Sequence, residues 1–113
     1  MDTKIFAPLF FAFLLSSPNV FAADSKVTIS SPANGAVVSK DVNVELNYAA
    51  VPGPEGDHLH LYLDEKRIDI LHPMKGTADV GMLDPGKHHI CLTVNTRGHA
   101  PTGAEACIDV MSK

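Results

Sequence analysis

The sequence predicts an all-β fold, an immunoglobulin-like antiparallel β-sandwich of about seven strands. Apolar and polar residues alternate in short segments, which is the pattern of a strand that buries one face. Glycine, proline, asparagine and aspartate residues separate these segments at intervals of roughly 8 to 12 residues. No segment keeps a helical period, so a domain built from sheets alone is the consistent interpretation.

Eight segments carry the alternating pattern, and the second of them is very short. In chain order they cover residues 26–30, 36–39, 42–48, 56–64, 68–71, 77–83, 87–94 and 104–111. The stretch 49–56 has no period and is predicted to be a loop. Alternation assigns one set of side chains to the core: Val42, Val44, Leu46, Tyr48, Leu59, Leu61, Leu63, Ile90, Leu92, Val94, Ala106, Ile108 and Val110, with Met82 as a further core side chain.

Residues 1–22 are predicted to be a secretory signal peptide, which leaves residues 23–113 as a single immunoglobulin-like domain. Lys4 precedes an apolar run, and small residues near Ala22 suit a cleavage site. The run is shorter than the ~20 residues that a membrane-spanning helix needs. We therefore expect a periplasmic or secreted protein, with no membrane insertion after signal removal.

The composition of the predicted domain argues against several kinds of ligand. All five phenylalanines lie in the predicted signal peptide, so Tyr48 and Tyr62 are the only large aromatic residues of the domain. Sugar binders and single-strand nucleic-acid binders stack their ligands on exposed aromatic rings. The chain also has 13 acidic residues against 9 lysines and arginines. This negative charge predicts no nucleic-acid partner and no anionic membrane surface.

The two cysteines, Cys91 and Cys107, are predicted to form a disulfide. An exported chain meets an oxidising compartment, in which a cysteine pair is normally bridged. If the two cysteines face each other in a hairpin of the last two strands, the hairpin is centred on His99 and both cysteines lie on its outward face. The alternative is a metal site built from the two thiolates.

All six histidines lie between His58 and His99. Because the leucines of the 56–64 strand point inward, His58 and His60 share the outward face of that strand. The sandwich order predicts that this strand lies antiparallel to 87–94, which brings His58 near the hairpin tip that carries His99. The three histidines are therefore predicted to form a surface cluster at one end of the domain.

Imidazole is the commonest protein ligand for zinc and copper, and intrinsic affinity among divalent ions favours copper. We expect copper as the cofactor of the cluster, with zinc as the alternative. His88, His72 and Met74 are further candidate ligands, and Met74 would favour copper(I) because a thioether is a soft donor. Asp57 would complete a zinc-like set or orient a histidine. His88 is alternatively a rim residue near Asp64 that hydrogen-bonds to the backbone.

The chain resembles uncharacterised bacterial exported domains. The residues that carry the resemblance are Gly56-Asp57-His58-Leu59-His60 with Asp64, Leu83-Asp84-Pro85-Gly86-Lys87-His88, and His99-Ala100-Pro101. They match a Gly-x-His-x-His strand, a Pro-Gly-x-His strand start and a later histidine. The resemblance implies a periplasmic immunoglobulin-like domain and draws attention to four histidines without assigning them a role: His58, His60, His88 and His99.

The segment Ser31-Pro32-Ala33-Asn34-Gly35-Ala36-Val37-Val38 is similar to the first strands of the periplasmic copper-resistance β-sandwich proteins. Those copper carriers use the N-terminal histidine of the mature chain. The predicted mature chain begins at Ala23 or Asp24, so it lacks the residue for an amino-terminal histidine brace. A copper site in this chain must therefore be internal.

Two functions from different classes are consistent with these patterns. The first is a periplasmic metal-binding protein that buffers or delivers copper through the surface cluster of His58, His60 and His99. The second is a non-catalytic interaction module without metal, whose partner is a periplasmic protein. An enzyme is not expected, because the chain has no Gly-x-Ser-x-Gly, no His-Glu-x-x-His and no phosphate-binding loop.

Overall fold

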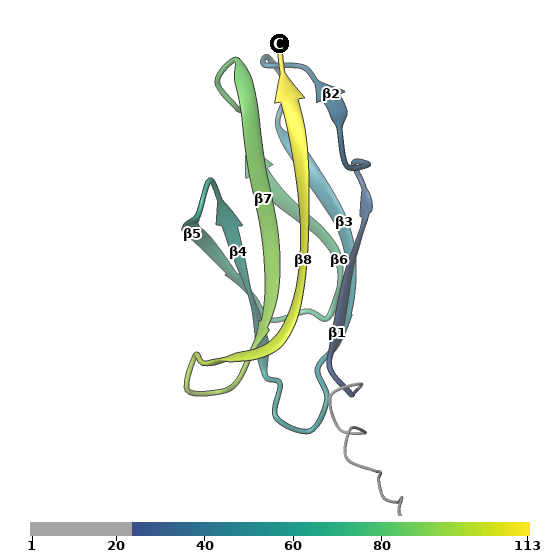
Figure 1. Cartoon of the computed structure of the whole chain (residues 1–113), viewed down its shortest axis with the longest axis vertical. Coiled ribbons are helices and arrows are strands. Elements are labelled where there is room, and N and C mark those ends of the chain that lie inside the picture. The colour runs from purple at the N-terminus through teal and green to yellow at the C-terminus, as the bar shows by residue number, and fades with distance from the viewer. Residues whose placement is uncertain (1–23) are drawn as a thin grey trace, which may run out of the picture.

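The computed structural model describes residues 24–113, and the predicted signal peptide, residues 1–22, lies outside this range. The described chain forms eight strands in two facing sheets (Figure 1), so the predicted all-β sandwich is confirmed. The strands are β1 (Lys26–Ser31), β2 (Ala36–Val38), β3 (Val44–Val51), β4 (His58–Leu63), β5 (Lys66–Leu71), β6 (Lys75–Gly81), β7 (Gly86–Asn95) and β8 (Pro101–Ser112). Within residues 24–113, no helix has the length and apolar character needed to cross a membrane.

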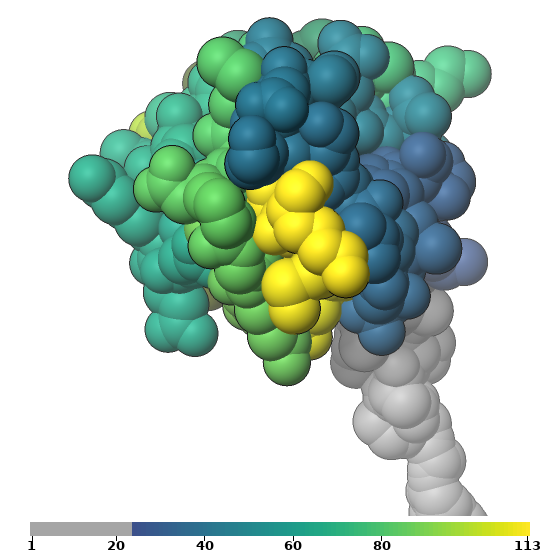
Figure 2. All heavy atoms as spheres, turned by 90° about the horizontal axis from the view of Figure 1, so that it is seen from above, coloured from purple at the N-terminus to yellow at the C-terminus, as the bar shows by residue number. Residues whose placement is uncertain are grey.

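The two sheets have different sizes. One has the strand order β1-β3-β6 and the other the order β2-β8-β7-β4-β5. Seen from above, the end of β8 lies between β2 and β7 (Figure 2). β2 runs parallel to β8, so the expectation of a purely antiparallel sandwich is wrong at this pair. β1 and β2 are consecutive in the chain but belong to different sheets, so β2 is an edge strand that pairs with β8 alone.

The core lies between the sheets and follows the predicted alternation. Leucines and β-branched residues of β3, β4 and β7 are fully buried there: Leu46, Leu59, Leu61, Ile90, Leu92 and Val94. Tyr48 is also buried, and its hydroxyl donates a hydrogen bond of 2.9 Å to the carbonyl of Pro73. Burying each large aliphatic side chain contributes about 2 kcal/mol, so this row holds the five-stranded sheet on the three-stranded one.

Two predicted core residues are wrong. Val42 is exposed because it precedes β3, which begins at Val44. Met82 is exposed because β6 ends at Gly81, whose φ of +95° changes the direction of the chain. The next side chain to enter the core is therefore Leu83. The predicted 49–56 loop is also shorter than expected, since β3 continues to pair as far as Val51.

The β7–β8 register and the antiparallel direction of β4 along β7 are those that the sequence predicted. β4 and β7 are antiparallel, with His58 opposite Asn95. β7 and β8 form a hairpin in which Cys91 lies opposite Cys107. The β3–β4 and β7–β8 connections both lie at the lower end of the sandwich in Figure 1, away from the C-terminus. This arrangement brings the start of β4 to the hairpin tip.

Candidate metal centre

His58 and His60 lie on β4, and His99 lies in the turn between β7 and β8. His58 pairs with Asn95 and His60 with Thr93, so the start of β4 runs beside the end of β7. The turn that follows β7 then returns His99 to the outer face of β4. Two strand positions and one turn position, about 40 residues apart in sequence, thus meet at one place.

The three imidazoles point one nitrogen each at a common centre. Nε2 of His58 lies 3.0 Å from Nε2 of His60, and these atoms lie 3.2 Å and 3.1 Å from Nδ1 of His99. A metal ion about 2.0–2.1 Å from each nitrogen would lie roughly 1 Å out of the plane of this triangle. That is the arrangement of three ligands on one face of a tetrahedron, with the fourth position left for water or another donor.

Hydrogen bonds among the three nitrogens cannot satisfy all three contacts. Nδ1 of His58 donates to Asp57, so in the neutral ring Nε2 of His58 carries a lone pair. If only one of the other two nitrogens carries a proton, the lone pair of the third nitrogen faces the lone pair of His58 Nε2. If both carry protons, the two N–H groups oppose each other. A cation at the centre would convert every repulsive contact into a coordination bond.

Two of the three histidines are buried, so the expectation of a surface cluster is wrong for them. His58 and His60 are each 2% exposed, whereas His99 is exposed. The physical reason is that the turn carrying His99 covers their face of β4, with the ring of His72 5.8 Å from that of His58. Burial, with neighbouring positive charge from His58, lowers the pKa of His60 and favours its neutral form.

Side chains beside the cluster hold two of its imidazole rings. Asp57 accepts a hydrogen bond of 2.9 Å from Nδ1 of His58, and this bond lowers the pKa of Asp57. A carboxylate behind a histidine fixes the ring and raises its basicity toward a metal. This contact is the one that the orienting role considered for Asp57 requires. Nδ1 of His60 lies 3.3 Å from the hydroxyl of Tyr62, which fixes the second ring less tightly.

The conformation of the hairpin tip depends on residues that the sequence analysis missed. His99 has a φ of +70°, a left-handed conformation that costs a non-glycine residue roughly 1–2 kcal/mol. The buried side chain of Asn95 donates to the carbonyl of His99, and the Thr96 hydroxyl accepts from the N–H of Ala100. The only sequence signal for these roles is that two polar residues follow the apolar face of β7.

The donor atoms of His72 and His88 are not among those that meet at this centre. His72 and Met74 lie in or beside the β5–β6 connection, where His72 is exposed and the carbonyl of Met74 accepts from the N–H of Ala50. His88 lies toward the opposite end of β7, next to Asp64 as the sequence analysis expected. Its ring nitrogens lie 2.7 Å from the Asp64 carboxylate and 2.7 Å from the Asp84 carbonyl, which leaves neither directed at a metal.

The predicted disulfide between Cys91 and Cys107 is confirmed. It lies on the outer face of the five-stranded sheet, as expected, in a groove of about 600 Å³ that begins beside the histidine cluster. The groove is lined by residues of β4, β5, β7 and β8, and the loops that join them: His60, Tyr62, Glu65, Arg67, His89, Cys91, Thr93, Asn95, His99, Pro101, Glu105 and Cys107. Solvent therefore reaches both the disulfide and the exposed side chain of His99 from one side.

Comparison with known proteins identifies the fold. No family model matches the chain, and no curated protein matches its sequence. Among solved structures, the fibronectin(III)-like modules of Clostridium thermocellum CbhA are similar, with a TM-score of 0.66 at 12% identity over 77% of this chain and 96% of theirs. The CARDB domain of a Pyrococcus furiosus protein, solved in complex with di-metal ions, has a TM-score of 0.51 at 20% identity over 80% of this chain and 88% of its own.

A third similar structure comes from an extracellular domain. It belongs to a B. thetaiotaomicron protein described as a hybrid two component system, with a TM-score of 0.54 at 14% identity, and the match covers 72% of this chain and 12% of that one. At these identities the similarity establishes a fibronectin-III-like or immunoglobulin-like sandwich. The disulfide fits a secreted protein, because cysteine pairs are normally bridged in oxidising compartments.

Proposed function

We propose that this protein is an exported metal-binding protein that holds one copper ion through His58, His60 and His99, for buffering or delivery in the periplasm. The observation that carries the proposal is the triangle of ring nitrogens with sides of 3.0–3.2 Å. Residues 24–113 contain a second group of three side chains of metal-binding type, His89, Cys91 and Cys107. Its two cysteines form the disulfide, so their sulfur atoms do not offer thiolates to a metal.

The surroundings of the triangle support binding of a cation. The Asp57 carboxylate stands behind His58 and supplies negative charge, while burial holds His60 neutral. The Asp57 carboxylate also lies 4.0 Å from Nε of Arg97, whose side chain is almost fully exposed and therefore opposes a cation only weakly. An ion would reach the centre from the side of His99, since the other two ligands are covered.

Copper is preferred over zinc on the chemistry of the donors. Three imidazoles suit both ions, and copper(II) binds nitrogen ligands more tightly than zinc does. Three nitrogens with an open position also suit zinc, which stays the alternative. Competition between equal concentrations of the two ions decides between them: copper is expected to displace zinc, and retention of zinc would reassign the metal.

The test is a copper titration of the purified protein without an affinity tag. We expect one copper per chain, lost in the His58→Ala/His60→Ala variant. The matched control is His88→Ala/His89→Ala, which removes two histidines from the other end of the same sheet and should keep the stoichiometry. Undiminished binding in the first variant, or no binding in the native protein with excess ion, would reject the proposal.

A second candidate function is supported by the fold. The similar solved structures include fibronectin-III-like and CARDB domains, and a sandwich of this type suits a non-catalytic interaction module with a periplasmic protein partner. The two candidates differ in one observable. The metal-binding function requires that copper or zinc raise the melting temperature at neutral pH, whereas the module requires no response to any divalent ion.

A further inference from the structure

The disulfide has two unequal ends. Cys91 on β7 is 7% exposed, whereas Cys107, directly opposite on β8, is exposed. Both residues line the groove on the outer face of the five-stranded sheet. An external thiol that enters this groove therefore meets Cys107 before it meets Cys91.

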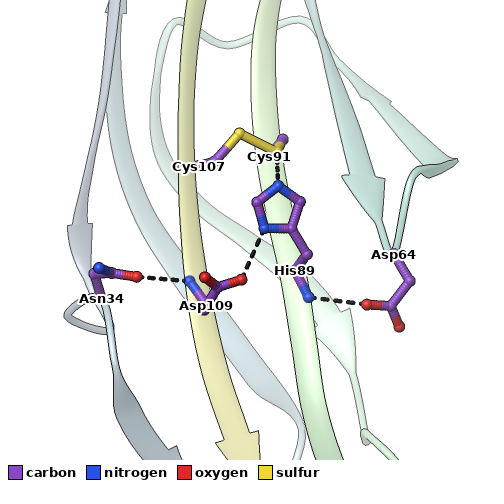
Figure 3. Close-up of a disulfide and its surroundings, with 6 residues drawn as sticks. All are labelled: Asn34, Asp64, His89, Cys91, Cys107 and Asp109. Carbon is purple, nitrogen blue, oxygen red and sulfur yellow. Dashed lines mark hydrogen bonds and ion pairs between the residues drawn. A yellow bond between two sulfur atoms is a disulfide. The ribbon is translucent and has the colours of Figure 1, made fainter.

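The buried end of the disulfide contacts an oriented imidazole (Figure 3). Nε2 of His89 lies 3.2 Å from Sγ of Cys91, and Nδ1 of the same ring lies 2.8 Å from a carboxylate oxygen of Asp109. The backbone N–H of Asp109 is in turn held by the side chain of Asn34, and the backbone N–H of His89 donates to Asp64. Because the carboxylate accepts from Nδ1, the other nitrogen of the ring is directed at the sulfur.

An imidazole beside a sulfur matters when the sulfur carries a negative charge. A neighbouring imidazolium lowers the pKa of a thiol and stabilises its thiolate. In thiol–disulfide exchange, the sulfur with the lower pKa is the better leaving group. The exposure of Cys107 favours attack at its sulfur, and the contact with His89 favours Cys91 as the leaving group. Both features therefore favour the same direction of cleavage.

We propose that the Cys91–Cys107 disulfide is a thiol-exchange site whose co-reactant is a dithiol or a small-molecule thiol such as glutathione. The attacking thiolate forms a bond to Sγ of Cys107, the bond between Cys107 and Cys91 breaks, and its electron pair leaves with Sγ of Cys91. The protonated ring of His89 stabilises that thiolate or gives it a proton.

A second thiol completes the step. It attacks the co-reactant sulfur of the mixed disulfide and releases Cys107 as a thiolate, so the cysteine pair gains two electrons and two co-reactant thiols become a disulfide. In the reverse sequence a co-reactant disulfide oxidises the reduced cysteine pair and is itself reduced to two thiols. Asp109 acts as a positioning residue for His89. The proposal uses none of the three candidate metal ligands and is tested on metal-free protein in the presence of a chelator.

The site of attack is measured directly on the native protein. Oxidised protein is mixed with limiting glutathione, quenched with acid at short times, alkylated and mapped by peptide mass spectrometry. The expected product carries glutathione on Cys107 and the alkyl group on Cys91. Glutathione mainly on Cys91 at the earliest times, or a folded protein that millimolar glutathione does not reduce, would overturn the proposal.

The role of His89 is measured by the rate of reduction. His89→Gln should slow reduction by glutathione on the order of tenfold, because the leaving thiolate loses its stabilising neighbour. Lys87→Gln is the matched control, since Lys87 is an exposed residue of the same strand and should leave the rate unchanged. Equal rates for all three proteins, each shown to be folded by its melting curve, would remove His89 from the mechanism.

Discussion

Asp57 is the side chain outside the three ligands on which metal affinity should depend most. It accepts from Nδ1 of His58, and loss of such a carboxylate typically weakens metal binding by about 10–100-fold. Asp57→Asn is therefore expected to lower copper affinity by that factor while keeping one ion per chain. The measurement is a competitive titration against a chelator of known affinity.

The control for this substitution is Asp41→Asn, which removes an exposed carboxylate near β2 whose partner is Lys40. It should leave the affinity at the native value. Equal losses in the two variants would mean that net charge, and not the contact with His58, governs binding.

His88 is the residue from which a pH dependence of stability is expected. Its hydrogen bond to Asp64, with a second to the Asp84 carbonyl, raises the pKa of His88 above its usual value. The protonated form is therefore favoured in the folded state, and its stabilisation is fully present below the pKa of about 6.5 of an unfolded chain. That stabilisation is lost as the pH rises through the raised pKa of the folded state.

The variant that tests this is Asp64→Asn in metal-free protein. NMR titration should place the pKa of His88 lower in the variant, and the difference in melting temperature from the native protein should shrink between about pH 5.5 and pH 8.5. Asp69→Asn on exposed β5 is the control and should keep the native titration. A difference in melting temperature that grows with pH would contradict a stabilising contact between protonated His88 and Asp64.

The β4–β5 hairpin contains a turn whose residues are unusual for its geometry. Asp64 and Glu65 connect the strands with φ values of 51° and 72°, the two-residue turn that favours Asp-Gly or Asn-Gly. Glu65→Gly should therefore stabilise the fold by about 1 kcal/mol, because the left-handed conformation costs a non-glycine residue roughly 1–2 kcal/mol. Urea unfolding measures the gain, and Glu65→Ala, which keeps the Cβ atom, should give none.

At the level of strands, the sequence was sufficient wherever alternation continued without interruption. Leu59 and Leu61 are buried as predicted, and the pairing of Cys91 with Cys107 placed His99 in the turn. The failure at Met82 has a local cause, since the positive φ of Gly81 reverses which side chain faces inward. The sequence alone does not show whether a glycine has a positive φ.

The candidate site was harder to predict than the sheets. Strand alternation and the hairpin register were sufficient to identify the three histidines, but not to predict that His58 and His60 are buried. Burial depends on the left-handed conformation of His99 and on its contact with Asn95, which is a tertiary contact within the turn. The contact between His89 and Cys91 was missed for a similar reason, because strand parity gives a shared face but not the direction of a ring.

For the whole domain, metal binding should appear as thermal stability. An ion at 100 times its dissociation constant that binds only the folded state adds about 2.7 kcal/mol. For a domain of this size each 1 kcal/mol raises the melting temperature by about 4–8 °C, so a shift of roughly 10–20 °C is expected. Differential scanning calorimetry with and without copper measures it.

The matched comparison for the thermal shift is His99→Ala, which removes the ligand supplied by the turn and leaves both β4 ligands in place. Its shift with copper should be much smaller than that of the native protein. A full shift in this variant would mean that copper stabilises the domain from another site.

An ion at the histidine centre would also act as a removable cross-link in the chain. It would tie β4 to a turn 39 to 41 positions later in sequence, whereas the disulfide ties positions 16 apart. The entropy lost on closing a loop grows with the logarithm of its length, so the ion would restrict a longer stretch of chain than the covalent bridge does. Amide hydrogen exchange at the lower end of the five-stranded sheet should therefore slow on loading, while exchange near the middle of the β7–β8 hairpin changes little.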